Sequence, residues 1–118
     1  MSDDEIIRPL GKTTIAPEVL VSIVQLSAQN VKGVSRLSDL PKRMSRFLRK
    51  GTDEGVHIVV EDGLVYVDLH VILNRDVDVR KVGLDIQHHV ARAISEMVGM
   101  GVGMVNVHIE DIDYFPED

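Results

Sequence analysis

Four side chains that could bind a metal ion lie in stretches where apolar and polar residues alternate: His57, Asp68, His70 and His108. Imidazoles and carboxylates are ligands that zinc accepts in tetrahedral sites, at bond lengths of about 2 Å. The pattern around them indicates strands, in which His57 lies opposite Asp68 and His70 only diagonally, with backbones roughly 7 Å apart. We therefore favour an exposed polar sheet face over a metal site, and we expect no metal and no cofactor.

A second group of interest is basic and lies in residues 40–51, a stretch without acidic residues. Its members are Lys42, Arg43, Arg46, Arg49 and Lys50. Apolar residues of the same stretch recur at helical spacing before Gly51, which predicts a short basic amphipathic helix over 39–50. Such a helix could present its cationic face to anionic lipid, to RNA or to an acidic protein. Charge runs are more often solvated faces, so the alternative is that the helix only covers the domain's own core.

The other chemistry-bearing residues form no catalytic pattern. His88 and His89 point in different directions on a predicted helix, and we expect His89 at the boundary of its buried face. Gly99, Gly101 and Gly103 end a helix and enter a strand, whereas a dinucleotide loop leaves a strand and opens a helix, so they predict a turn. The sequence contains no Walker loop, no nucleophile elbow and no His-Glu-x-x-His motif. We therefore expect no catalytic residue, no small-molecule substrate and no enzymatic activity.

The composition of the chain excludes further functional classes of protein. The chain has 118 residues, which suits a single core, and its formal net charge is −6. An acidic protein with 3% aromatic residues and no tryptophan lacks both the phosphate-neutralising charge and the stacking rings of a general nucleic-acid binder. It has no cysteine, which fits a reducing compartment. Neither a signal peptide nor a long apolar span is visible, so we expect neither secretion nor a membrane crossing.

The periodicity of the apolar residues predicts the elements that must position these groups. We expect a strand at 12–15, a helix at 17–31, the short helix at 39–50, strands at 56–61 and 64–73, a helix at 79–98 and a strand at 103–110. Asp62-Gly63 is a strong signal for a two-residue hairpin turn, which pairs 60 with 65, 58 with 67 and 56 with 69. The predicted buried stripe of the long helix comprises Val79, Val82, Ile86, Val90, Ala93 and Met97.

This element order predicts an α+β fold. We expect a two-layer sandwich, strand-helix-(short helix)-strand-strand-helix-strand, with both long helices on one face of a small mixed sheet whose strand order stays open. Residues 11–112 would form the single domain, 1–10 a disordered acidic tail and 113–118 an acidic C-terminal tail.

Several stretches resemble one known family. They are Gly11-Lys12 through Ile15-Ala16-Pro17-Glu18-Val19, Val31-Lys32-Gly33-Val34, the hairpin at 56–73, Gln87 through Val90, Ala93-Ile94, Met97, Gly99, and Val105-Asn106-Val107-His108-Ile109. In this order they resemble the alkaline shock protein family, small bacterial envelope stress response proteins. The resemblance implies a cytoplasmic, non-enzymatic protein, without catalytic residues to carry over. It also implies self-association, or a membrane-anchored partner that holds the protein at the inner membrane face.

We therefore expect a non-enzymatic cytoplasmic interaction or scaffold protein of the envelope stress response type. Its partner would be another protein, a further copy of itself, or both, with membrane association only through such a partner. Two surfaces are candidates, the basic helix 40–50 and the outer sheet face around Tyr66 and His70. The alternative function is binding of an anionic ligand, either RNA or a lipid head group, by the basic helix.

Overall fold

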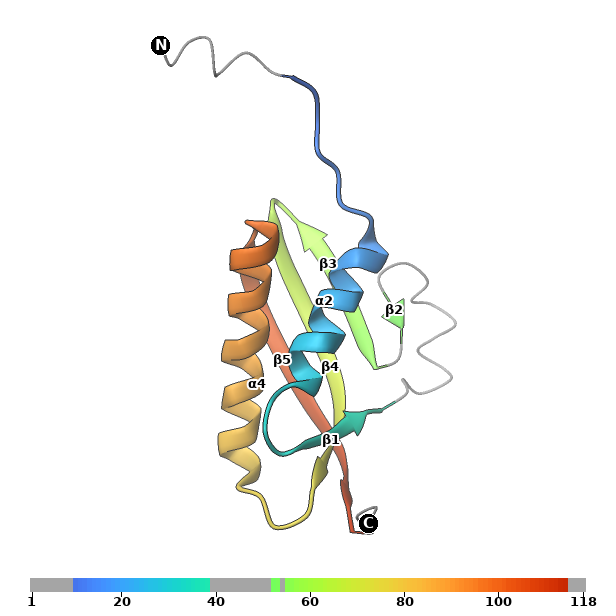
Figure 1. Ribbon diagram of the computed structural model, residues 1–118, viewed down its shortest axis with the longest axis vertical. Helices are drawn as coiled ribbons and strands as arrows, with labels where there is room; N and C mark the ends of the chain where they lie inside the picture. Colours follow the sequence, from blue (N-terminus) through green and yellow to red (C-terminus); the bar gives the residue numbers. More distant parts are fainter. Residues whose placement is uncertain (1–9, 39–51, 54, 115–118) are drawn as a thin grey trace.

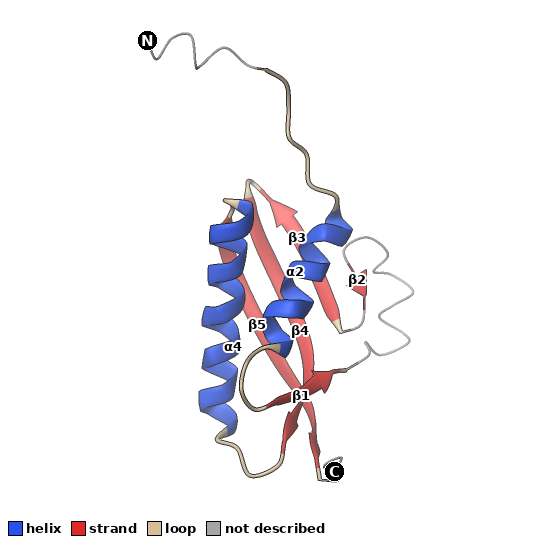
Figure 2. Cartoon of the chain, in the orientation of Figure 1, coloured by secondary structure: helices blue, strands red, loops and turns tan. Residues whose placement is uncertain are grey.

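The computed structural model describes residues 10–38, 52–53 and 55–114, and these form two layers (Figure 1). One layer is a five-stranded sheet, and the other consists of two helices that pack on the same face of it (Figure 2). The elements are α2 (Pro17–Gln29), β1 (Val34–Leu37), β2 (Thr52–Asp53), β3 (Val56–Glu61), β4 (Leu64–Asn74), α4 (Val79–Ala93), the π-helical turn η1 (Ile94–Val98) and β5 (Gly101–Asp113). The predicted two-layer α+β fold is confirmed.

The hairpin of β3 and β4 has the predicted register. Val60 pairs with Val65, and His57 lies opposite Asp68. Asp62 and Gly63 both have positive φ, 52° and 77°, as a type I′ turn requires. The turn and the alternation of apolar residues therefore specify the same pairing, in which the valines at 56, 65 and 67 face the helices.

Strand β4 lies at the centre of the sheet. Its first half pairs with β3 and its second half with β1, both antiparallel, while β5 runs parallel to its whole length on the other side. Helix α4 connects β4 to β5 and packs on β5, as a parallel connection requires. The sheet is therefore mixed, as predicted, and β5 stands beside β4.

Three differences from the predicted strands concern the first half of the chain, one of them being the short strand β2, which was not predicted. Residues 12–15 form no strand, because they are exposed and no neighbouring strand pairs with them in the described structure. Instead, the strand β1 forms after Gly33, where only a helix end was predicted. Its four residues have little pattern of their own, and their extended shape comes from pairing with β4.

The helices begin and end close to the predicted residues. Pro17 opens α2, which ends at Gln29, two residues before the predicted end. The Asp78 carboxylate caps α4 by accepting a hydrogen bond from the backbone N–H of Lys81. Gly99, with φ 77°, ends the π-helical turn η1.

The core lies between the two layers. Helix α2 contributes Leu20, Val21, Val24 and Ala28, and β4 contributes every second residue from Val65 to Leu73. From the predicted stripe of α4, Val82, Ile86 and Val90 are buried, but Val79 is 40% and Met97 69% exposed. Ile94 is fully buried instead. Ile94 follows Val90 by four residues, as α-helical spacing allows, but the wider π-helical turn then brings Val98 rather than Met97 against the core, which is why the predicted stripe is wrong at Met97.

Candidate functional site

The face of the sheet opposite the helices, which we call the outer face, is the candidate functional surface. Successive side chains of a strand alternate between the two faces. Val65, Val67 and Leu69 face the core, so Tyr66, Asp68 and His70 face the other way. Side chains of β3 and β5 line up with them in rows across the sheet because their register with β4 is fixed.

The first row is apolar and partly exposed. Val59 pairs with Tyr66, and Tyr66 pairs with Met104 on β5. Val59 is 41% exposed and Met104 53% exposed. The register between β4 and β5 shifts at Gly103, which leaves Gly103 as an extra residue in β5. A Cβ atom there would overlap the Tyr66 ring, so the absent side chain is what lets Tyr66 lie across β5.

The next row is polar and is centred on Asp68. Its Oδ1 accepts a hydrogen bond of 3.2 Å from Asn106 Nδ2 and lies 3.0 Å from His108 Nε2. Asn106 stands beside Asp68 in the register, and His57 stands opposite it on β3. The position of His57 was predicted from the hairpin turn, and β5 supplies the other two partners because it pairs with β4.

His70 is buried although it belongs to the outer face. It is 5% exposed, and its ring stacks on that of His108 with 4.7 Å between centroids and 19° between planes. His70 Nδ1 lies 2.7 Å from Glu110 Oε2. An ionised carboxylate only accepts hydrogen bonds, so Nδ1 is the donor. The other ring nitrogen, Nε2, is buried and has no hydrogen-bond partner among the described residues.

A second irregularity of β5 brings Glu110 to His70. Val71 pairs with Ile109 and Ile72 with Asp111, so Glu110 is the extra residue of the bulge. Bulges redirect side chains from the regular alternation of a strand. The bulge thus produces a contact that the spacing of residues along the sequence did not predict.

The arrangement of these groups does not favour a metal site. Within the described ranges, no group of three or more His, Asp or Glu side chains is placed to hold a metal ion. The two stacked rings direct nitrogens to different carboxylates, His70 to Glu110 and His108 to Asp68. The four residues considered from the sequence therefore do share one face, but the contacts there are hydrogen-bonded pairs.

The remaining sequence predictions have mixed outcomes. His89 is exposed, as is His88, so the boundary position predicted for His89 is wrong. Gly99 forms the predicted turn, whereas Gly101 and Gly103 already belong to β5. Of the two methionines near these glycines, Met100 packs against the core and Met104 lies on the outer face. The basic cluster of Lys42, Arg43, Arg46, Arg49 and Lys50 lies outside the described residues.

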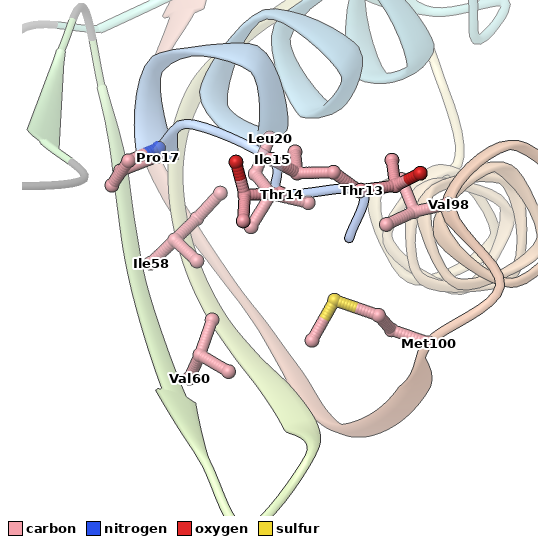
Figure 3. Close-up of a pocket in the computed structure, with 9 residues that line it drawn as sticks. All are labelled: Thr13, Thr14, Ile15, Pro17, Leu20, Ile58, Val60, Val98 and Met100. Atoms are coloured by element: carbon pink, nitrogen blue, oxygen red, sulfur yellow. The ribbon is translucent and has the colours of Figure 1, made fainter. Parts of the chain in front are cut away.

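An apolar groove on the helix side is a second feature of interest (Figure 3). It has a volume of about 700 Å³ and lies between the start of α2 with the residues before it, the end of η1, and β3. Its lining consists of Thr13, Thr14, Ile15, Pro17, Leu20, Ile58, Val60, Val98 and Met100. None of these side chains titrates, so the groove offers no acid, base or charged nucleophile.

None of the described helices is both long enough and apolar enough to cross a membrane.

Comparison with solved structures supports the architecture. MamM CTD in its copper form matches with a TM-score of 0.52 and 12% identity, over 86% of this chain and 91% of that one. A variant of MamM CTD matches with a TM-score of 0.51 and 14% identity, over 80% of this chain and 95% of that one. At these identities the likeness shows the fold alone.

Fold and outer face together define a small α+β domain with helices on one side of a mixed sheet. The chain belongs to the alkaline shock protein family, whose described role is a cell envelope-related function, and the family model matches residues 5–114. The uncharacterized protein Spy1535 of Streptococcus pyogenes serotype M6 is 33% identical over 104 residues, which are 87% of this chain and 80% of that protein. The uncharacterized protein YqhY of Bacillus subtilis is 26% identical over 107 residues, 89% of this chain and 79% of that protein. The family resemblance seen in the sequence is confirmed.

Proposed function

We propose that the protein is a non-enzymatic interaction module of the cell envelope, and that it binds a protein partner through the outer face of its sheet. The observation that supports this most is the partly exposed apolar row of Val59, Tyr66 and Met104, which lies beside a polar row. Interface cores are enriched in tyrosine and methionine and are bordered by polar groups, as this face is. Its envelope-related family is consistent with such a role.

The polar row would give the contact its specificity. Asp68 is already held by Asn106 and His108, so its carboxylate is oriented before any partner arrives. Preorganised polar groups lower the entropy that binding costs. A partner would therefore bury the apolar row and align hydrogen bonds with the row beside it.

We further propose that the protein acts in the cytoplasm, near the inner membrane face, through a membrane-bound partner, and that it takes part in the envelope stress response. The family's envelope-related function supports this placement. In this proposal the domain contributes only contacts and carries out no turnover.

The test compares two surface variants in cells. Met104→Glu places a charge in the apolar row, whereas Leu84→Glu places one on α4, where the side chain is 56% exposed. Crosslinking and mass spectrometry should recover the same partner with the wild-type protein and with Leu84→Glu. Recovery should fall by at least about tenfold with Met104→Glu, since a charge buried in an interface costs more than about 1.4 kcal/mol. Equal recovery with both variants contradicts the proposal.

A further inference from the structure

The groove of Figure 3 and the segment before α2 are two apolar surfaces without an occupant in the described chain. Residues 10–16 form an extended arm whose base, Thr13 through Ile15, lies along the groove, while its start leads away from the domain (Figure 1). Leu10 on this arm is 102% exposed, and Ile15 at its base is 38% exposed. The sequence pattern of residues 12–15 is that of an edge strand, yet no strand of the described chain pairs with it.

A free strand edge borders the groove. Strand β2 pairs only with Val56 and His57, so no described strand pairs with the outer edge of residues 58–61. Ile58 and Val60 from this part of β3 line the groove, and Val60 is 47% exposed. An extended segment placed there could add to β3 by backbone pairing while its apolar side chains fill the groove.

We propose that the arm of a second copy of this chain occupies the groove, and that the two copies exchange arms about a twofold axis. The arm's own base, Thr13 through Ile15, forms one wall of the groove. Because the start of the same arm leads away from the domain (Figure 1), the space beside its base is open to the arm of a second copy. Such reciprocal exchange gives a closed dimer in which each copy contributes the same contacts.

Length and charge agree with this occupant. Nine further residues precede Leu10 and include Ile6 and Ile7. An extended chain advances about 3.3 Å per residue, so residues 6–15 reach roughly 30 Å, enough to follow an edge strand. The acidic residues of the tail, Asp3, Asp4 and Glu5, come before residue 6, and the charged residues within 6–15 are the basic Arg8 and Lys12. Glu61 and Asp62 form an acidic hairpin tip at the end of β3, so residues 6–15 and this tip are complementary in charge.

The exchange uses a surface separate from the outer face, so its test needs no other protein. Because the chain contains no cysteine, engineered thiols report only the intended contact. One chain carries Leu10→Cys, a second chain of different mass carries Val60→Cys, and both positions are exposed enough to tolerate the change. After mixing and oxidation, a disulfide-linked heterodimer is expected. Replacing Val60→Cys by Leu84→Cys on α4 is the matched control and should give no such product.

A second measurement determines which copy supplies the arm. A single chain with both Leu10→Cys and Val60→Cys should form dimers and not a monomeric crosslink. Sedimentation equilibrium should show a dimer for the full chain and a dissociation constant weaker by at least about tenfold after deletion of residues 1–12. A monomeric crosslink, equal crosslinking to Leu84→Cys, or an unchanged association constant after the deletion overturns the proposal. These results do not depend on whether the outer face binds another protein.

Discussion

The ring of His70 stacks on that of His108, and Glu110 holds the buried ring of the pair through Nδ1. The two histidines are neighbours because β5 runs parallel to β4 in a register that pairs them directly. One ring is 7% exposed and hydrogen-bonded, while the other is 46% exposed. Because of this difference in burial, we expect His70 to contribute more to the free energy of unfolding than His108 does.

Replacing His70 by alanine should lower the free energy of unfolding by about 1–3 kcal/mol, because it removes a buried ring and its hydrogen bond to Glu110. His108→Ala should cost less than about 1 kcal/mol, since its pair with Asp68 is partly exposed. Urea denaturation followed by circular dichroism measures both values. Equal losses for the two variants would show that the stacking, and not the buried contact, carries the stabilisation.

Gly55 should be intolerant of any side chain. Its φ is +82°, and an added Cβ would overlap the carbonyl oxygen of Ser38. Gly55→Ala should therefore cost more than about 2 kcal/mol, since backbone atoms must move. The matched control is Gly63→Ala, whose φ is +77° but whose Cβ would meet nothing within 4 Å. Thermal unfolding should show a smaller loss for this control, about 1–2 kcal/mol, which is the cost of the left-handed backbone alone.

The π-helical turn predicts an unequal response to truncation at Ile94 and Met97, two of its three apolar residues. Ile94 is fully buried and Met97 is 69% exposed. Ile94→Ala should cost about 2–5 kcal/mol, as large-to-small changes in cores do. Met97→Ala should stay within about 0.5 kcal/mol. If the Met97 variant proved the more damaging in chemical denaturation, the helix would continue with α-helical spacing.

The start of α2 offers a stabilising change. Ala16 is its N-cap, and no side chain there accepts a hydrogen bond from the first turn. Ala16→Asp should raise the unfolding free energy by about 1 kcal/mol, because a carboxylate can accept that bond and also faces the positive end of the helix. Asp78→Ala at the N-cap of α4 should have the opposite effect of similar size. Calorimetric melting temperatures that move in the same direction would refute this account of the two caps.

Much of the fold could be predicted from local pattern. The hairpin, its register and both long helices follow from the alternation of apolar residues and from Asp62-Gly63, which act over short distances along the chain. Strand β1 could not be predicted, because its shape depends on pairing with β4. The arm residues 12–15 show the reverse case, since they have the strand pattern but no strand beside them in the described chain.

The candidate site was predictable only in part, for the same reason. The hairpin turn placed His57 opposite Asp68, and the structure has that pair. The contacts of His70 and Tyr66 depend on the bulges at Glu110 and Gly103, and a bulge shifts pairing without changing the apolar pattern. Likewise, nothing in the spacing of Ile94 and Met97 indicated a π-helical turn.

Side chains alternate along β4, so one backbone segment supplies residues to both faces of the sheet. The segment that carries Tyr66, Asp68 and His70 outward also carries Val65, Val67 and Leu69 into the core. The amides of such a central strand exchange only when the whole domain unfolds, because local fraying does not reach them. A ligand bound to the outward groups therefore stabilises the folded domain as a whole. Occupancy of the surface should thus slow hydrogen–deuterium exchange deep inside the molecule, increasingly so as the ligand's free concentration rises above its dissociation constant.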